Sequence, residues 1–241
     1  ATLTDASLRG ANLNHADIAG ATLDRADFSK ASLRCATITS VRKARKVSFD
    51  GADLQGASIT DSYFPLASFV DTTLDHLAVE DSRFQRATFQ NCSWTNAAFI
   101  DSHFQGAQLS GEVLDRTYFD HAQMQRANLE YASLRHGVFD QLQLQFSRAD
   151  GAQFDNSTLR FADFSNASLV SASFRFAQLH DATFSGAYVT RADFEHAMGL
   201  ERVVGLDSRA VYRLPKFVDL GLSGSLAVGS RSHSFSHSFS G

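Results

Sequence analysis

The chain has 241 residues but only two cysteines, two prolines, two methionines and one tryptophan. It contains no Cys-x-x-Cys pair, no glycine-rich phosphate-binding loop and no Ser/His/Asp or Cys/His grouping. No apolar run is long enough for a membrane span, and the sequence shows no signal-peptide pattern. These absences leave an enzyme without residue support. They predict no cofactor and no membrane association, and they favour a soluble protein of the cytoplasm.

The feature that dominates the chain is a large apolar residue at every fifth position. From Phe49 to Phe194 there are 30 such positions in register, and only Ala149 among them is small. A small residue usually stands two places before each centre, so the unit reads A-x-[L/F]-x-x. A step of five matches neither the 3.6-residue period of a helix nor the two-residue period of a strand. A repeat this short predicts a solenoid, in which stacked units share one core.

The units centred on Leu54 and Ile59, with Ala52 and Ala57 before them, resemble the pentapeptide-repeat family. The resemblance covers roughly residues 1–196. It implies an all-β fold, a right-handed quadrilateral β-helix in which four units make one coil. The central residue and the small residue would point inward and the other three outward. The resemblance also implies a protein that presents a surface rather than an active site.

The repeat is already in register at the start of the chain, where Leu3 to Ile38 add eight centres. The resulting 38 units make nine and a half coils, or a rod of about 46 Å at roughly 4.8 Å per coil. An unpaired ladder edge is therefore expected at Ala1. Either the numbering starts inside a longer protein, or this edge pairs with something.

Residues 41–46 lie outside the five-residue phase, so we expect them to leave the wall as a protruding loop. Four of the six are cationic: Arg42, Lys43, Arg45 and Lys46. The segment is either a tolerated surface insertion or a contact loop for an acidic partner or nucleic acid. A short loop near the second coil resembles the Qnr type of quinolone-resistance protein. The second, longer loop of that type is missing here.

After His196 the sequence repeat ends, and residues 197–222 are expected to cap the solenoid. Asp207 as an N-cap and Pro215 as a stop predict one or two helical turns between them. Residues 223–241 are rich in Ser, Gly and His and are expected to be disordered, whether native or added. The resemblance to Qnr-type proteins permits a homodimer through the C-terminal cap.

Several inward positions break the pattern. Ala149 under-fills its corner of the core, and Phe146 is placed to swing in. The large residues Leu77, Glu112 and Leu142 stand where a small one is expected, so we predict local distortion, with Glu112 turned out to solvent. Of the two cysteines, Cys35 is outward and Cys92 is an inward core filler, so both are predicted to be free thiols.

Residues twenty apart should stack in columns along the rod. The third face of each coil brings together six carboxylates: Asp61, Asp81 and Asp101 in one column, with Glu80, Asp120 and Asp140 in the next. The simple explanation is that Asp is common at outward turns. The functional one is a negative stripe that imitates the phosphate backbone of DNA.

Two other columns contain side chains that could bind a ligand or a metal ion. One column on the fourth face consists of Gln85, Gln105, Gln125 and Gln145. We interpret it primarily as an amide ladder that stiffens the rod and secondarily as a polar recognition stripe. The seven histidines of the repeat region all fall on outward positions. His76, His136 and His196 share a column, but they are three coils or about 14 Å apart, too far for one metal ion.

Residues 1–196 contain 17 Lys and Arg against 23 Asp and Glu, a net charge of −6 that becomes −10 without the four cations of residues 41–46. A duplex-binding protein needs a basic stripe. The net charge therefore argues against direct nucleic-acid binding along the rod.

Our leading hypothesis is a non-catalytic protein-binding rod. Its acidic face would dock in the DNA-binding saddle of a type II topoisomerase, such as DNA gyrase or topoisomerase IV, as the Qnr resemblance implies. It would compete with DNA or protect the enzyme from a poison, and the cations of residues 41–46 would touch an acidic patch or displace the drug. The rival is a scaffold or effector-type interaction module without a topoisomerase role.

Overall fold

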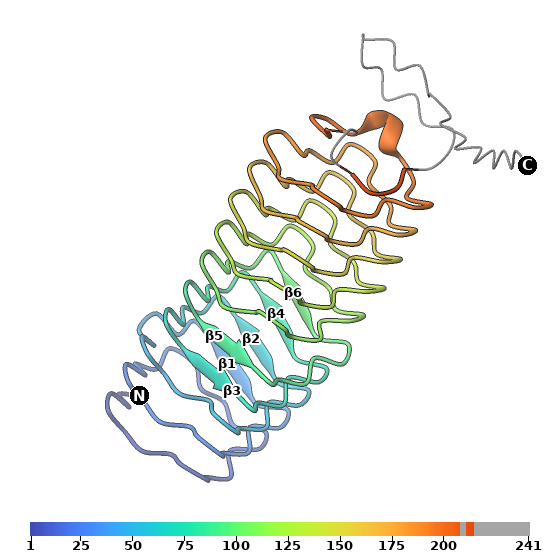
Figure 1. Ribbon diagram of the computed structural model, residues 1–241. Helices are drawn as coiled ribbons and strands as arrows, with labels where there is room; N and C mark the ends of the chain where they lie inside the picture. Colours follow the sequence, from blue (N-terminus) through green and yellow to red (C-terminus); the bar gives the residue numbers. More distant parts are fainter. Residues whose placement is uncertain (208–210, 215–241) are drawn as a thin grey trace, which may run out of the picture.

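The computed structural model describes residues 1–207 and 211–214, which form a rod of stacked square coils (Figure 1). Parallel backbone bridges join residues twenty apart, as in the series Gln123, Gln143 and Asp163. Twenty residues are four pentapeptides, so each unit supplies one side of the coil. The all-β, right-handed quadrilateral β-helix is confirmed.

Most units form isolated bridges, and three-residue strands occur on two faces between residues 37 and 100. One parallel sheet has the order β1 (Thr37–Thr39), β2 (Ser58–Thr60), β4 (Ala78–Glu80) and β6 (Ala98–Ile100). A second sheet pairs β3 (Ser68–Val70) with β5 (Thr88–Gln90). We number the faces so that β3 and β5 lie on the first face and the four-stranded sheet on the third. The second face follows the first, and the fourth closes the coil.

The core is built largely by phenylalanine columns. Phe154, Phe174 and Phe194 stack with ring centroids 5.0 and 4.8 Å apart and their planes within 6°. Phe164, on the opposite side of the coil, meets Phe174 edge to face at 5.5 Å. Offset stacking and edge-to-face contact are the favourable geometries for aromatic rings. The coil spacing therefore suits the side chain that occurs most often at the centres from Phe49 to Phe194.

The corners of the coil require a left-handed backbone at the second turn residue. Asp61, Asp81 and Asp101 occupy such corners with φ of 47°, 49° and 51°. Asp, Asn and His tolerate this conformation better than most residues with a side chain. Backbone sterics therefore help to place short polar side chains along the outer edges of the rod.

The expectation of a protruding loop at residues 41–46 is wrong. Val41 and Ala44 are fully buried, and Lys43 forms a bridge with Thr22. The Leu23 N–H donates to the Lys43 carbonyl at 2.5 Å. The segment is a side of the coil that contains one extra residue, Arg42. The coil there is 21 residues long, because Val41 and Ala44 still fill inward positions.

The coil also continues beyond the sequence repeat. Met198 bridges Gln178, Val204 bridges Thr183 and Arg213 bridges Asp193. Within residues 1–207 and 211–214 the only helical element is one 3-10 turn, η1 (Leu200–Arg202). Arg213 is extended, so the helix predicted between Asp207 and Pro215 is wrong for residues 211–214, while residues 208–210 lie outside the described chain. So does the whole of the predicted tail, residues 223–241.

The irregular inward positions behave differently from expectation. Phe146 is 57% exposed and does not fill the space beside the buried Ala149. Leu77 and Leu142 are buried and keep the turn hydrogen bond that alanine makes elsewhere, at 3.1 and 3.2 Å, so the wall absorbs them without distortion. Glu112 is 4% exposed and points inward. No helix in the described residues is long and apolar enough to cross a membrane.

Candidate interaction surfaces

The structure brings the predicted acidic residues together on one edge of the rod. The N–H of Asp61 donates to the Glu80 carbonyl at 3.2 Å, and that of Asp101 donates to the Asp120 carbonyl at 3.1 Å. These bonds hold successive corners in line between the third and fourth faces. We call the set the acidic column: Asp61, Glu80, Asp81, Asp101, Asp120 and Asp140.

Three of these six carboxylates have a basic partner. Asp61 pairs with Arg42 at 2.5 Å, and Asp140 pairs with Arg160. Asp101 lies 3.6 Å from the His121 imidazole, an ion pair when that ring is protonated. Glu80 and Asp81 have no such partner among the described residues. The field of the column is therefore concentrated near its middle.

Asp120 is the carboxylate whose protonation the fold perturbs. Partial burial raises its pKa, and the neighbouring Asp140 carboxylate raises it further. The same group accepts the backbone N–H of Asp140 at 3.1 Å. Burial and the neighbouring like charge therefore both disfavour the ionised form of Asp120.

A flat sheet adjoins the acidic column. The outward side chains of the third face are small at three successive coils, Ser58, Ala78 and Ala98. They line a shallow hollow of about 270 Å³ together with Ile100 and Glu80. A partner that reached the column would meet this floor without steric obstruction.

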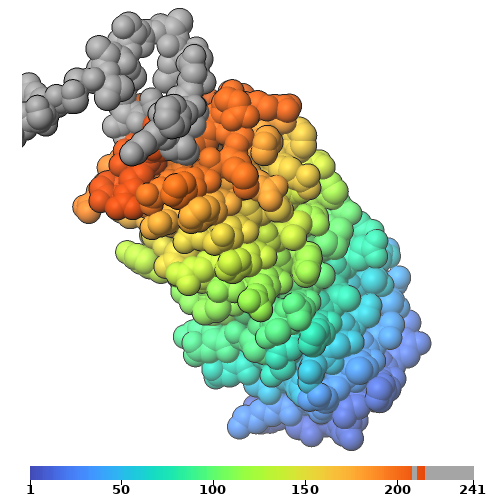
Figure 2. All heavy atoms as spheres, turned by 90° about the vertical axis from the view of Figure 1, so that its right-hand side faces the viewer, coloured from blue at the N-terminus to red at the C-terminus, as the bar shows by residue number. Residues whose placement is uncertain are grey.

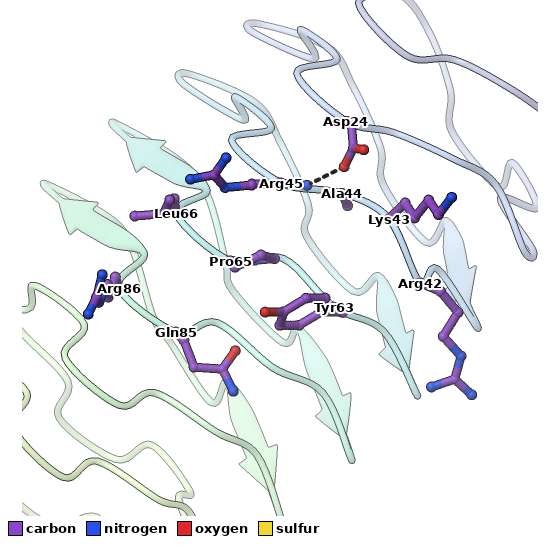
Figure 3. A pocket seen from close by; sticks show the side chains of 10 residues that line it. All are labelled: Asp24, Arg42, Lys43, Ala44, Arg45, Tyr63, Pro65, Leu66, Gln85 and Arg86. Carbon is purple, nitrogen blue, oxygen red and sulfur yellow. Dashed lines mark hydrogen bonds between the residues drawn. The ribbon is translucent and has the colours of Figure 1, made fainter.

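The four cations of residues 41–46 do not act as one cluster. Arg42 turns toward Asp61 and joins the acidic column. Lys43 and Arg45 line a hollow of about 530 Å³ on the fourth face (Figure 3). Lys46 occupies the corner next to it, with φ of 59°. Arg42 also lines this hollow, but its guanidinium pairs with Asp61, whereas the other three cations form no ion pair with a described residue.

Sequence reasoning missed the residues that share this hollow. Arg86 lines it from two coils along, and Tyr63, Pro65 and Leu66 form its apolar part (Figure 3). Arg86 and Arg126 follow Lys46 in the same corner at intervals of two coils. The twenty-residue period would have revealed them had residues 41–46 been kept inside the wall.

The predicted axial ladder of glutamines is not formed. The side-chain oxygens of Gln85, Gln105, Gln125 and Gln145 are buried and accept no hydrogen bond. The Nε2 group of Gln105 donates to Gln123 of the next coil at 2.8 Å, and that of Gln145 donates to Gln143 of its own coil and to Asp163 of the next coil, each at 2.6 Å. The glutamines therefore bond to other side chains of the fourth face rather than to one another.

Glu112 forms a buried polar site that the sequence analysis placed in solvent. Its carboxylate accepts the Asn91 N–H at 2.7 Å, the Cys92 N–H at 3.1 Å and the Trp94 indole N–H at 2.8 Å. Three donors satisfy a charge that would otherwise be costly to bury. Burial raises the pKa of the Cys92 thiol to about 12, with Glu112 contributing. Cys92 is therefore a protonated thiol, which contacts the Phe69 carbonyl oxygen at 2.9 Å.

Other chemistry finds no support in the described chain. No group of three or more His, Cys, Asp or Glu side chains there has the arrangement of a metal site. Cys35 and Cys92 are both free, as predicted. The side of the rod shown in Figure 2 is a continuous surface of side chains without a deep cleft. Binding through faces and edges is the mode that this geometry suits.

Several solved structures are similar to this chain. A solved structure of HetL, a pentapeptide repeat protein involved in heterocyst differentiation regulation from Nostoc sp. strain PCC 7120, is 26% identical with a TM-score of 0.47, covering 86% of this chain and 87% of that one. QnrB1, a plasmid-mediated fluoroquinolone resistance protein, is 17% identical with a TM-score of 0.47, covering 91% and 92%. No curated protein matches the chain.

Family models account for almost the entire rod. The model described as pentapeptide repeats (8 copies) matches residues 1–41 and four overlapping segments between 102 and 195. The model described as a pentapeptide repeat region matches residues 42–119. Together with the stacked coils of four five-residue units, these matches show that the chain belongs to the pentapeptide-repeat family.

Proposed function

We propose that the protein is a non-catalytic binding rod whose acidic column docks into the DNA-binding groove of a protein partner. Pentapeptide-repeat proteins are generally non-enzymatic structural or interaction proteins. A type II topoisomerase, DNA gyrase or topoisomerase IV, in the cytoplasm is the specific partner that we propose. The rod would compete with DNA or protect the enzyme from an inhibitor.

The alignment of six carboxylates along one edge carries this proposal. From Asp61 to Asp140 the column covers about four coils, or roughly 19 Å. Six charges over that length give about one per 3 Å, and the two arginine pairs reduce this to about one per 5 Å. Duplex DNA carries one charge per roughly 1.7 Å of its axis. The column imitates DNA at lower density, so docking needs contacts from the flat third face as well.

A specific observation favours a second candidate, the scaffold or effector-type module. Arg42, Arg160 and His121 stand beside three of the six carboxylates. If these pairs serve only to hold the wall, the column is a by-product of Asp at turns. In that case the rod presents other surfaces to its partner. The C-terminal end, where Met198, Val204 and Tyr212 are 48%, 57% and 63% exposed, supports the proposal of a homodimer through the cap.

The test is a gyrase supercoiling assay with increasing amounts of the purified full chain, with and without a fluoroquinolone. We expect inhibition of supercoiling or protection from the drug. Asp81→Lys should abolish the effect, because it reverses an unpaired charge at the middle of the column. Asp71→Lys is the matched control, since Asp71 is also an aspartate at a left-handed corner, but at the end of the first face, half a coil away from Asp81.

Two outcomes would reject the topoisomerase proposal. One is no effect on gyrase or topoisomerase IV at micromolar protein. The other is an equal loss for Asp81→Lys and Asp71→Lys, which would trace the effect to overall charge. If the rod then retained a protein partner in pull-downs, and Asp81→Lys bound it as well as the unaltered chain, the scaffold candidate would stand.

A further inference from the structure

The net negative charge of the rod conceals a face of the opposite sign. Six cations lie on the fourth face or at its corner with the first, and we call them the basic strip: Lys43, Arg45, Lys46, Arg83, Arg86 and Arg126. None of the six forms an ion pair with another described residue. Cations elsewhere on the rod commonly do, as Arg25, Arg34, Arg148 and Arg175 show. The basic strip is therefore free to attract an anion.

The hollow of about 530 Å³ within the strip has a mixed lining (Figure 3). Arg45, Leu66 and Arg86 line the corner side, and the ring of Tyr63 lies across the middle. Tyr63 is 39% exposed, so its ring is open to a stacking partner. The one carboxylate in the lining, Asp24, accepts the backbone N–H of Arg45 at 2.9 Å. Cations beside an exposed ring suit a ligand that combines phosphate with a flat base.

The acidic column limits what the fourth face can accept. Asp61, Asp81 and Asp101 follow the corner with the third face, on the other side of the basic strip. A duplex lying on this narrow face would bring its second phosphate strand toward those carboxylates. A single strand can keep its phosphates at the basic corner and direct its bases across the face. Like-charge repulsion thus selects one strand over two.

We propose that the fourth face binds single-stranded nucleic acid. Lys46, Arg86 and Arg126 hold the phosphates, and Tyr63 stacks on a base. Gln85 also lines the hollow, beside this path. His103 adds no charge at neutral pH, because burial and the adjacent Arg83 lower its pKa. The net negative charge of the rod does not prevent this binding, because positive and negative charges lie on different faces.

The dimensions set the expected strength. Lys46 and Arg126 are four coils apart, about 19 Å. This length fits the lower end of the roughly 4 to 16 nucleotides that single-strand-binding folds cover. Three phosphate contacts predict that the logarithm of the association constant falls with the logarithm of salt concentration with a slope of about −2.

Fluorescence anisotropy with a labelled oligothymidylate of about twelve nucleotides tests the proposal. The full chain is titrated at several NaCl concentrations from about 50 mM upward. We expect saturable binding with the slope given above. Arg86→Gln should weaken binding several-fold and make the slope shallower by about 0.7. Tyr63→Leu should weaken binding and leave the slope unchanged, because stacking releases no counterions.

Arg191→Gln is the matched control, since Arg191 also occupies a left-handed corner, with φ of 61° against 56° for Arg86. It should bind like the unaltered chain. Asp81→Lys should bind the oligonucleotide more tightly, although the same change is expected to abolish docking to a topoisomerase. The two proposals can therefore fail separately.

Three results would overturn the proposal. The first is no anisotropy change at the lowest salt concentration. The second is an equal effect of Arg86→Gln and Arg191→Gln. The third is stronger displacement of the probe by a polyglutamate peptide, or by duplex of the same length, than by unlabelled oligothymidylate. A polyglutamate preference would assign the face to an acidic protein segment.

Discussion

At the scale of single residues, two side chains of the same type differ in reactivity when one points into the core and the other toward solvent. Cys92 is inward and its thiol pKa is raised to about 12, whereas Cys35 is exposed. We expect iodoacetamide at pH 8 to modify Cys35 quickly and Cys92 only after unfolding in urea, since the thiolate is the reactive form. Mass spectrometry of the peptides measures both. Cys35→Ser should remove the fast reaction, and modification of Cys92 at the same rate as Cys35 would contradict the assignment.

Asp120 gives a prediction with a definite sign. Its pKa is raised in the folded state, so folding binds protons there and this group lowers stability as pH rises through its titration range. Asp120→Asn keeps an acceptor for the Asp140 N–H and removes the charge. We expect it to stabilise the rod at pH 7 by a few tenths of a kcal/mol, after allowance for solvent screening. The gain should vanish near pH 2. Thermal melts at both pH values measure it, and a loss of stability at pH 7 would disprove it.

Glu112 was predicted to face solvent because burying a charged group is costly, but it is buried. The pattern placed it inward but could not show that the backbone of Asn91 and Cys92 and the indole of Trp94 would all donate to it. We expect Glu112→Gln to cost about 2 kcal/mol, because the amide turns a donor toward donors. Thermal melts followed by the fluorescence of Trp94, the single tryptophan, report it. Glu130→Gln, on the surface beside Arg148, should change little.

At the scale of elements, the six-residue side of the coil was the feature most difficult to predict. Six residues out of phase fit either a loop of six or a wall with one extra residue. The two possibilities differ in whether Val41 and Ala44 are buried. Both are buried, but the sequence did not indicate it, because Ala44 stands where other units have a large apolar residue. The acidic column was predictable because its period follows from the repeat. Its partners His121 and Arg160 stand further along the same columns, whereas the orientation of the Gln85 series depends on side-chain torsions that no period specifies.

Because residues 41–46 form a side of the coil, we expect deletion of Arg42 and the substitution Ala44→Asp to affect stability differently. Deleting Arg42 restores a unit of five and loses only an exposed ion pair, so the melting temperature should change little. Ala44→Asp buries an unpaired carboxylate and should cost more than about 3 kcal/mol. Circular dichroism melts compare them. A protruding loop would tolerate both changes equally.

At the scale of the whole molecule, the chain has a net charge of −4 but presents faces of both signs. We expect it to be retained at low salt by an anion-exchange resin and also by immobilised heparin. Arg86→Gln should elute from heparin at lower salt than Arg191→Gln, because the two variants have the same net charge and differ only in the face affected. Identical elution from heparin would show that charge segregation does not govern binding.

The extra residue at Arg42 lengthens one side without changing which face follows which. Loss of a complete unit of five would act differently, because every residue before it would then lie over the next face. Such an excision would turn the first coils by a quarter revolution relative to the rest and leave the core composition almost intact. The number of units between two residues therefore determines which faces of the rod they occupy relative to each other. Shortening the chain by one unit can bring surfaces now on adjacent faces into the same line.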